Sequence, residues 1–76
     1  MAKAVYLVFL SRGQWHVDLE GQSVGPFETR DEAIVAAIPL AQAMEQSGRR
    51  AEVLAPGDDR RHHVAWPLIE EVRRRA

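Results

Sequence analysis

The hydrophobic pattern changes from continuous to alternating within the first twenty residues. Residues 4–10 are all apolar or aromatic and are too few for a typical globular helix, which predicts a central β-strand. After a short turn at residues 11–13, Trp15, Val17 and Leu19 alternate with polar residues, which is the period of a half-buried strand. These two segments therefore predict a β-hairpin.

The middle of the chain has the pattern of a capped amphipathic helix. Thr29 and Glu32 have capping-box spacing, in which the Thr29 hydroxyl accepts from the Glu32 amide and the Glu32 carboxylate reaches back to the Thr29 amide. Apolar residues at helical spacing form the expected buried face: Ala33, Ile34, Ala37, Ile38, Leu40, Ala41 and Met44. Pro39 lies nearly opposite that face, where a kink costs least. The helix is expected to end near Ser47 and Gly48.

The last third of the chain predicts a second hairpin. Residues 50–55 and 61–66 are expected strands, with turn residues between them, and His62, Val64 and Trp66 are expected to share one face. Residues 23–27 are a candidate short edge strand. Residues 68–75 are a candidate C-terminal helix with a basic end.

These elements predict a single α+β domain over residues 1–76 with the order β-β-α-β-β. The expected sheet is antiparallel, has three to four strands, and packs on one kinked helix followed by a short helical tail. One helix covers only one face of a sheet, so an all-apolar central strand leaves one set of side chains facing away. The two possible sets are Val5, Leu7 and Phe9, or Tyr6, Val8 and Leu10.

Something must cover the second face of that strand. The candidates are residues 68–72 of the same chain or the equivalent face of a second chain. A chain of 76 residues hides only about 60% of the surface that its unfolded form exposes, so symmetric association adds stability that its own core barely supplies. We therefore favour a homodimer through this apolar face.

The composition of the chain limits its partners and its cellular location. The chain has no cysteine, which excludes disulfides and thiolate metal sites. Ten Lys and Arg balance eleven Asp and Glu, so no global field draws the protein onto nucleic acid or an anionic membrane. The apolar run 4–10 is far shorter than the roughly 20 residues of a spanning helix, and no signal-peptide cleavage pattern follows it. We expect a cytoplasmic protein without a membrane partner.

Titratable residues do not form a catalytic or metal-binding pattern. His62 and His63 are adjacent, and neighbouring residues on a strand point to opposite faces, so the two imidazoles do not converge on one metal ion. His16 with Asp18 or Glu20 could transfer protons, but no nucleophile or oxyanion site accompanies them. We therefore expect that the protein is not an enzyme and that it has no metal or other cofactor.

Basic clusters give the alternative hypothesis, a nucleic-acid-binding module. Arg49 and Arg50 precede one expected strand, and Arg60 and Arg61 precede the next, so these pairs could flank the second hairpin and contact phosphates. Acidic residues are interleaved with the clusters, which favours a self-compensated surface and makes nucleic acid the less favoured partner. Trp15 and Trp66 could stack on bases, but both are predicted to be core residues.

One set of residues resembles a known family: Trp15, Val17, Gly21, Phe27, Thr29, Glu32 and Ala33, followed by an alanine-rich helix. The pattern, from about residue 6 to residue 64, resembles short bacterial proteins grouped as domain of unknown function 2188. The resemblance implies this fold and no known activity. The step from Phe27 to Ala33 is also similar to the arm-binding domains of phage integrases, in which a three-stranded sheet enters the DNA groove. Asp18 and Glu20 on the second strand differ from the basic residues usual on such reading strands.

Overall fold

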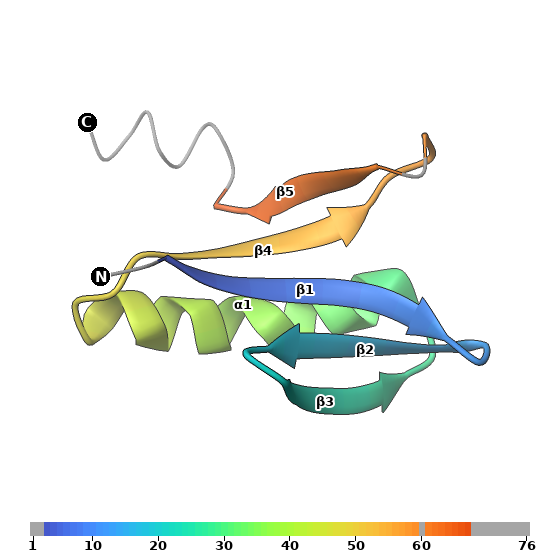
Figure 1. The fold of residues 1–76 in the computed structure, drawn as a ribbon, viewed down its shortest axis with the longest axis horizontal. Helices are drawn as coiled ribbons and strands as arrows, with labels where there is room; N and C mark the ends of the chain where they lie inside the picture. Colours follow the sequence, from blue (N-terminus) through green and yellow to red (C-terminus); the bar gives the residue numbers. More distant parts are fainter. Residues whose placement is uncertain (1–2, 60, 68–76) are drawn as a thin grey trace.

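A computed structural model describes residues 3–59 and 61–67, which form a five-stranded mixed sheet and one helix (Figure 1). The elements are β1 (Ala4–Ser11), β2 (Gln14–Leu19), β3 (Gln22–Phe27), α1 (Arg30–Gln46), β4 (Ala51–Pro56) and β5 (His62–Trp66). The strand order is β3-β2-β1-β4-β5, so β1 is the central strand, as its continuous apolar sequence predicts. The α+β class is confirmed.

The sheet differs from the expectation in two respects. It has five strands rather than three or four, because the candidate edge strand is formed as β3. It is also not wholly antiparallel, because β1 and β4 run parallel, with Ala4 opposite Ala51 and Leu7 opposite Leu54. The segment between β3 and β4 contains α1, which returns the chain along the sheet, and a crossover of this length allows β4 to align with β1.

Two tight turns set the register of the first three strands. Arg12 and Gly13 both have positive φ, and the next turn at Glu20 and Gly21 does too. A two-residue hairpin turn with both central residues at positive φ matches the natural twist of the flanking strands. The second turn ends at Gly21, and the candidate edge strand at residues 23–27 is formed as part of β3.

The helix has the predicted start and end. Thr29 is the N-cap, and its hydroxyl accepts from the Glu32 amide at 3.1 Å. The Glu32 carboxylate accepts from the Glu28 amide, at 3.1 Å, and not from the Thr29 amide as predicted. The cap is thus extended by one residue. Ser47 is the C-cap and Gly48 follows with φ of 101°.

The helix contributes three small residues to the fully buried core, and larger residues such as Ile34 and Ile38 pack partly buried against it. Its fully buried residues are Ala33, Ala37 and Ala41, spaced by one helical turn. Pro39 is exposed, as predicted, whereas Leu40, expected on the buried face, is 41% exposed. Small side chains on this stripe allow α1 to lie close against the sheet.

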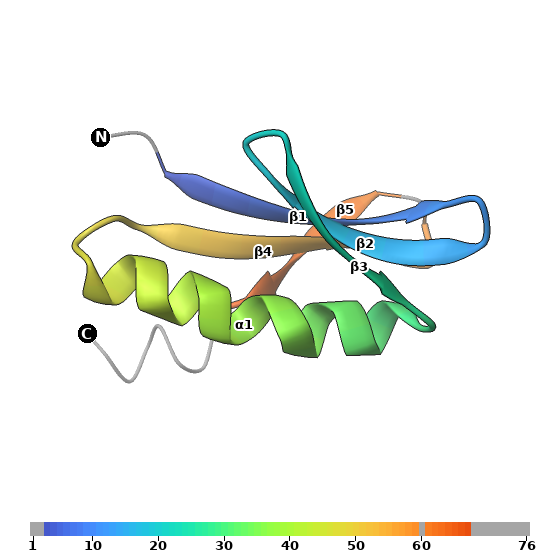
Figure 2. The same cartoon turned by 90° about the horizontal axis from the view of Figure 1, so that it is seen from below.

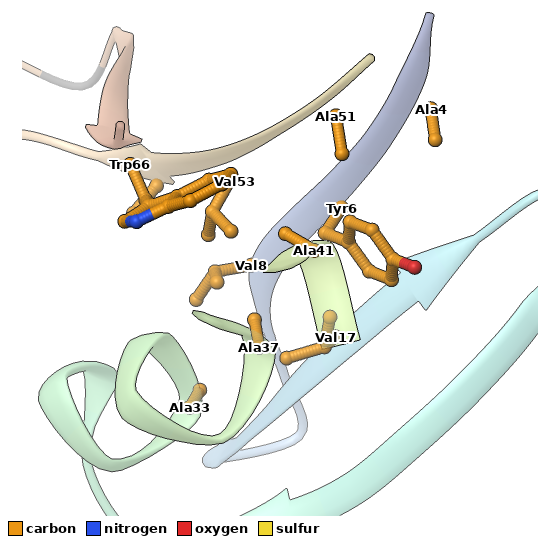
Figure 3. Packing of buried hydrophobic residues seen from close by; sticks show 11 residues of the cluster. Ala4, Tyr6, Val8, Val17, Ala33, Ala37, Ala41, Ala51, Val53 and Trp66 are labelled. Atoms are coloured by element: carbon orange, nitrogen blue, oxygen red, sulfur yellow. The ribbon is translucent and has the colours of Figure 1, made fainter. Parts of the chain in front are cut away.

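The core lies between α1 and the facing side of the sheet (Figure 3). Its buried members are Ala4, Tyr6, Val8, Val17, Ala33, Ala37, Ala41, Ala51, Val53, Ala55 and Trp66. The largest fully buried side chains are valines: Val8, Val17 and Val53. The Tyr6 hydroxyl, at the edge of the core, donates to the Leu40 carbonyl at 3.3 Å.

A register shift in β5 overturns the expected facing of its side chains. Trp66 lies opposite Val53 and is buried against the core, but Val64 lies opposite Leu54 on the other face. The shift places Ala65 as an extra residue between these two pairs, as in a β-bulge. His62 and Val64 therefore do not share a face with Trp66, because alternation is interrupted between them.

Candidate binding surfaces

The face of the sheet that points away from α1 is called the open face below. Its centre is apolar. Figure 2 shows the sheet nearly edge-on, with α1 along one side of it. Val5, Leu7 and Phe9 on β1 alternate with residues buried under α1, so they point to the other side. Leu7 lies opposite Leu54 on β4, and Leu54 lies opposite Val64 on β5. The apolar strip therefore crosses three adjacent strands.

Of the two sets that the sequence left possible, the uncovered one is thus Val5, Leu7 and Phe9. These three side chains and Leu54 are half-buried by their neighbours in the sheet, and Val64 is 51% exposed. Among the described residues, no secondary-structure element lies over them. The candidate cover at residues 68–72 lies outside the described residues.

Polar groups border this strip on the side of β2 and at one corner. The His16 imidazole stacks on the Phe9 ring, with centroids 5.4 Å apart and planes at 24°. Asp18 lies opposite Leu7. At the start of β1 and β4, the Lys3 ammonium and the Glu52 carboxylate are 3.1 Å apart. An apolar centre with a polar rim is the usual organisation of a protein interface.

The residues considered for acid–base chemistry do not form one site. His16 is engaged with Phe9, and Glu20 forms an ion pair with Arg49. In the part of the chain that the structure describes, no hydrogen bond joins His16 to Asp18 or to Glu20. No proton-transfer pair is assembled among these three residues.

The histidines near the second hairpin turn have separate surroundings. The His63 Nε2 lies 2.9 Å from the Asp59 Oδ1, and the Arg61 amide donates to the same oxygen at 3.0 Å. The His63 hydrogen bond, followed by that of Arg61, holds the pKa of Asp59 below its usual 3.8. His62 lies opposite Pro56 in the sheet. Within residues 3–59 and 61–67, no three His, Asp or Glu side chains gather as metal ligands.

The arginines of the nucleic-acid alternative do not gather at one place. Arg49 pairs with Glu20, and Arg50 precedes β4. Arg61 follows β4, at the other end of a six-residue strand that is roughly 20 Å long. Arg60 lies outside the described residues. Among those described, Arg49 and Arg50 are therefore separated from Arg61 by the length of the hairpin.

A cleft with a volume of about 440 Å³ lies where α1 begins. The residues that line it are Trp15, Arg30, Pro56, Gly57 and Asp58. The Arg30 Nε donates to the Pro56 carbonyl at 2.7 Å and joins the helix to the end of β4. The sequence pattern does not indicate this cleft, because its residues come from three distant segments, and the pattern at Trp15 points only to base stacking or to the core.

A smaller apolar groove of about 240 Å³ lies between α1 and β3. Its lining residues are Tyr6, Val17, Leu19, Gln22, Val24, Leu40 and Ala43. The exposure of Leu40 follows from this groove, because β3 makes few contacts with the helix and leaves the helix side open there. In the described part of the chain, no helix is long and apolar enough to cross a membrane.

Comparison with known protein families identifies the family of this chain. Residues 6–65 match the family model DUF2188, described as an uncharacterized protein conserved in bacteria. The match includes most of β1, all of β2, β3, α1 and β4, and β5 as far as Ala65. No curated protein and no solved structure matches the chain.

Proposed function

The chain belongs to this family of uncharacterised bacterial proteins, and we propose that it is a non-catalytic binding module that forms a homodimer through the open face. One observation supports this most: Leu7, Phe9 and Leu54 are large apolar residues on the open face, where no described element covers them. The large residues of the other face, such as Tyr6 and Trp66, are instead buried in the core. Contiguous apolar surface of this kind is typical of an interface.

The size of the open face fits a weak dimer. Five strands about 4.8 Å apart and about six residues long span roughly 24 by 20 Å, or about 500 Å² on each copy. Two such faces bury about 1,000 Å², which is at the lower limit for a specific interface. We therefore expect association in the micromolar range rather than an obligate dimer.

A second copy is a suitable occupant because the strip reaches from the central strand to one edge of the sheet, so a two-fold axis that crosses the strands can place it on its own equivalent. Two sheets then pack face to face at about 10 Å. Lys3 and Glu52 lie at a corner of the sheet, so their ion pair can stay in water.

Sedimentation over a range of concentrations tests this proposal. We expect the wild-type protein to dimerise at micromolar concentration and Leu7→Lys to remain monomeric, because a buried ammonium without a partner opposes association. Val64→Lys is a second variant at a more exposed position, less prone to disturb folding. Val35→Lys is the matched control, because Val35 is 68% exposed on the helix. A strictly monomeric wild type would rule the homodimer out, as would equal effects of all three substitutions.

The alternative, nucleic-acid binding through Arg49, Arg50, Arg60 and Arg61, has less support. The pairing of Arg49 with Glu20 and the distance from Arg50 to Arg61 both weaken a continuous phosphate-binding surface. Salt-dependent binding of a random oligonucleotide by the wild-type protein would favour it over the homodimer. That the protein is not an enzyme and acts in the cytoplasm also stays a prediction.

A further inference from the structure

The cleft at the start of α1 has the size of a small-molecule site and lies on the covered side of the sheet. Its volume of about 440 Å³ is within the range of roughly 300–1,000 Å³ typical of ligand pockets. Trp15 shares a sheet face with the buried Val17, so the cleft borders the core rather than the open face. Binding there is therefore independent of the proposed dimer.

The walls of the cleft are held in place by hydrogen bonds. Arg30 is fixed to the Pro56 carbonyl through its Nε. The Gly57 amide donates to the Arg61 carbonyl at 2.8 Å, and Asp59 accepts from the Arg61 amide and from His63. Gly57 packs so closely on His63 that a Cβ would lie 2.5 Å from the imidazole Cδ2. A wall fixed in this way loses little conformational entropy when a ligand binds.

Three different chemical groups meet at the cleft. Trp15 is half-buried and supplies an aromatic surface. The Nη1 of Arg30 is 3.1 Å from Asp31, a carboxylate that is 86% exposed, and such a surface pair is weak enough for a ligand carboxylate to replace it. Asp58 is exposed, and no described residue pairs with it.

The two charges decide the class of ligand. A purely anionic ligand at Arg30 would face the Asp58 carboxylate, and a purely cationic ligand at Asp58 would face the Arg30 guanidinium. A zwitterion satisfies both. We propose that this cleft binds a free α-amino acid with an aromatic side chain, whose carboxylate contacts Arg30, whose ammonium contacts Asp58 and whose ring lies on Trp15.

Titrations followed by ¹H–¹⁵N correlation spectra test this with three probes that share a phenyl ring. L-Phenylalanine has both charges, hydrocinnamate lacks the ammonium group, and phenethylamine lacks the carboxylate. The two tryptophans give two indole signals, and the Trp15 signal should move while that of the buried Trp66 stays in place. We expect phenylalanine to bind about fivefold or more tightly than either analogue.

Substitutions at the two charged positions assign the contacts. Asp58→Asn should weaken phenylalanine binding about fivefold and leave hydrocinnamate binding unweakened. Arg30→Gln should also weaken phenylalanine binding about fivefold, and it should leave phenethylamine binding unweakened. Arg12→Gln, in the β1–β2 turn, is the matched control and should change nothing. Since Asp58 is exposed, its variant keeps the test valid even if Arg30→Gln disturbs the fold. Equal affinity for the three probes, or no movement of the Trp15 signal at millimolar phenylalanine, would overturn the proposal.

Discussion

The two faces of the sheet are made of the same strands but use apolar residues in different ways. On the face under α1, Ala51, Val53 and Ala55 alternate along β4 and are almost completely buried. On the open face, the same strand presents Glu52 and Leu54, which are half-buried. The aliphatic residues of β1 show the same division, with Ala4 and Val8 buried on one side and the larger Leu7 on the other. On β1 and β4, the larger aliphatic side chain therefore lies on the less buried face.

This difference has a geometric cause. Where the helix presents Ala33, Ala37 and Ala41 it lies close to the sheet, so the aliphatic residues of β4 that it covers are small. Close packing then replaces bulk as the source of stability, because dispersion and burial depend on how completely each atom is surrounded. On the open face no helix imposes this limit, and the bulky residues remain available for a partner. The comparison thus predicts opposite sensitivities to changes in side-chain volume.

Enlarging a residue on the covered face should have the largest effect. Ala37→Leu adds three carbons where α1 meets the sheet, and we expect the free energy of unfolding to fall by about 3 kcal/mol, because the helix must move or the side chain must adopt a strained rotamer. Urea denaturation measures this. Val35→Leu enlarges an exposed residue of the same helix and should change the free energy by less than about 0.5 kcal/mol. Similar losses for both variants would show that the helix–sheet contact is not tightly packed.

Truncation on adjacent positions of β4 compares the two faces directly. Val53→Ala removes two carbons from a fully buried site and should destabilise the dilute protein by about 2 kcal/mol. Leu54→Ala removes three carbons from a half-buried site and should cost only about 1 kcal/mol. The smaller deletion is therefore expected to be the more harmful, as measured by urea denaturation at submicromolar concentration.

The same pair of variants sharpens the comparison when protein concentration is raised. If copies associate through the open face, the wild type gains stability with concentration and Leu54→Ala gains less, since only the folded protein dimerises. Val53→Ala should gain as much as the wild type. A penalty for Leu54→Ala that does not change with concentration would show that the open face makes no intermolecular contact.

The sequence predicted those features that depend on local chemistry. The continuous run at residues 4–10 identified the central strand, and the spacing of Thr29 and Glu32 located the start of α1. Gly48 marked the end of the helix. Each of these signals acts over a few residues, where backbone conformation and side-chain hydrogen bonds are determined locally.

Features that depend on the path of the chain could not be obtained in this way. The parallel pairing of β1 with β4 joins segments more than forty residues apart, and no local pattern specifies it. The bulge at Ala65 rotates Trp66 onto the covered face, although strict alternation grouped it with Val64. The cleft likewise assembles Trp15 and Arg30 from separate elements. The described arginines of the two pairs are also separate in space, because Arg49 and Arg50 lie at one end of the second hairpin and Arg61 lies at the other.

A charged contact at the turn between β4 and β5 gives the smallest expected effect. His63, and then the Arg61 amide, hold the pKa of Asp59 below 3.8 in the folded protein, so folding favours its charged form. The resulting stability is fully present above about pH 3.8 and is lost as the pH falls through the lower folded pKa. Thermal midpoints of the wild type and Asp59→Asn, compared between about pH 7 and about pH 2, should differ slightly and converge over that acidic range.

Two further variants separate this contact from the packing of either face. His63→Ala removes the main cause of the pKa shift, so adding Asp59→Asn to it should produce a smaller pH-dependent change than in the wild type. Asp58→Asn removes a neighbouring exposed carboxylate without a described partner, and it measures the background effect of losing one negative charge. Since the contact is exposed and lies in a turn, its effect should not depend on protein concentration. A difference between wild type and Asp59→Asn that stays constant down to about pH 2 would contradict the hydrogen bond as its origin.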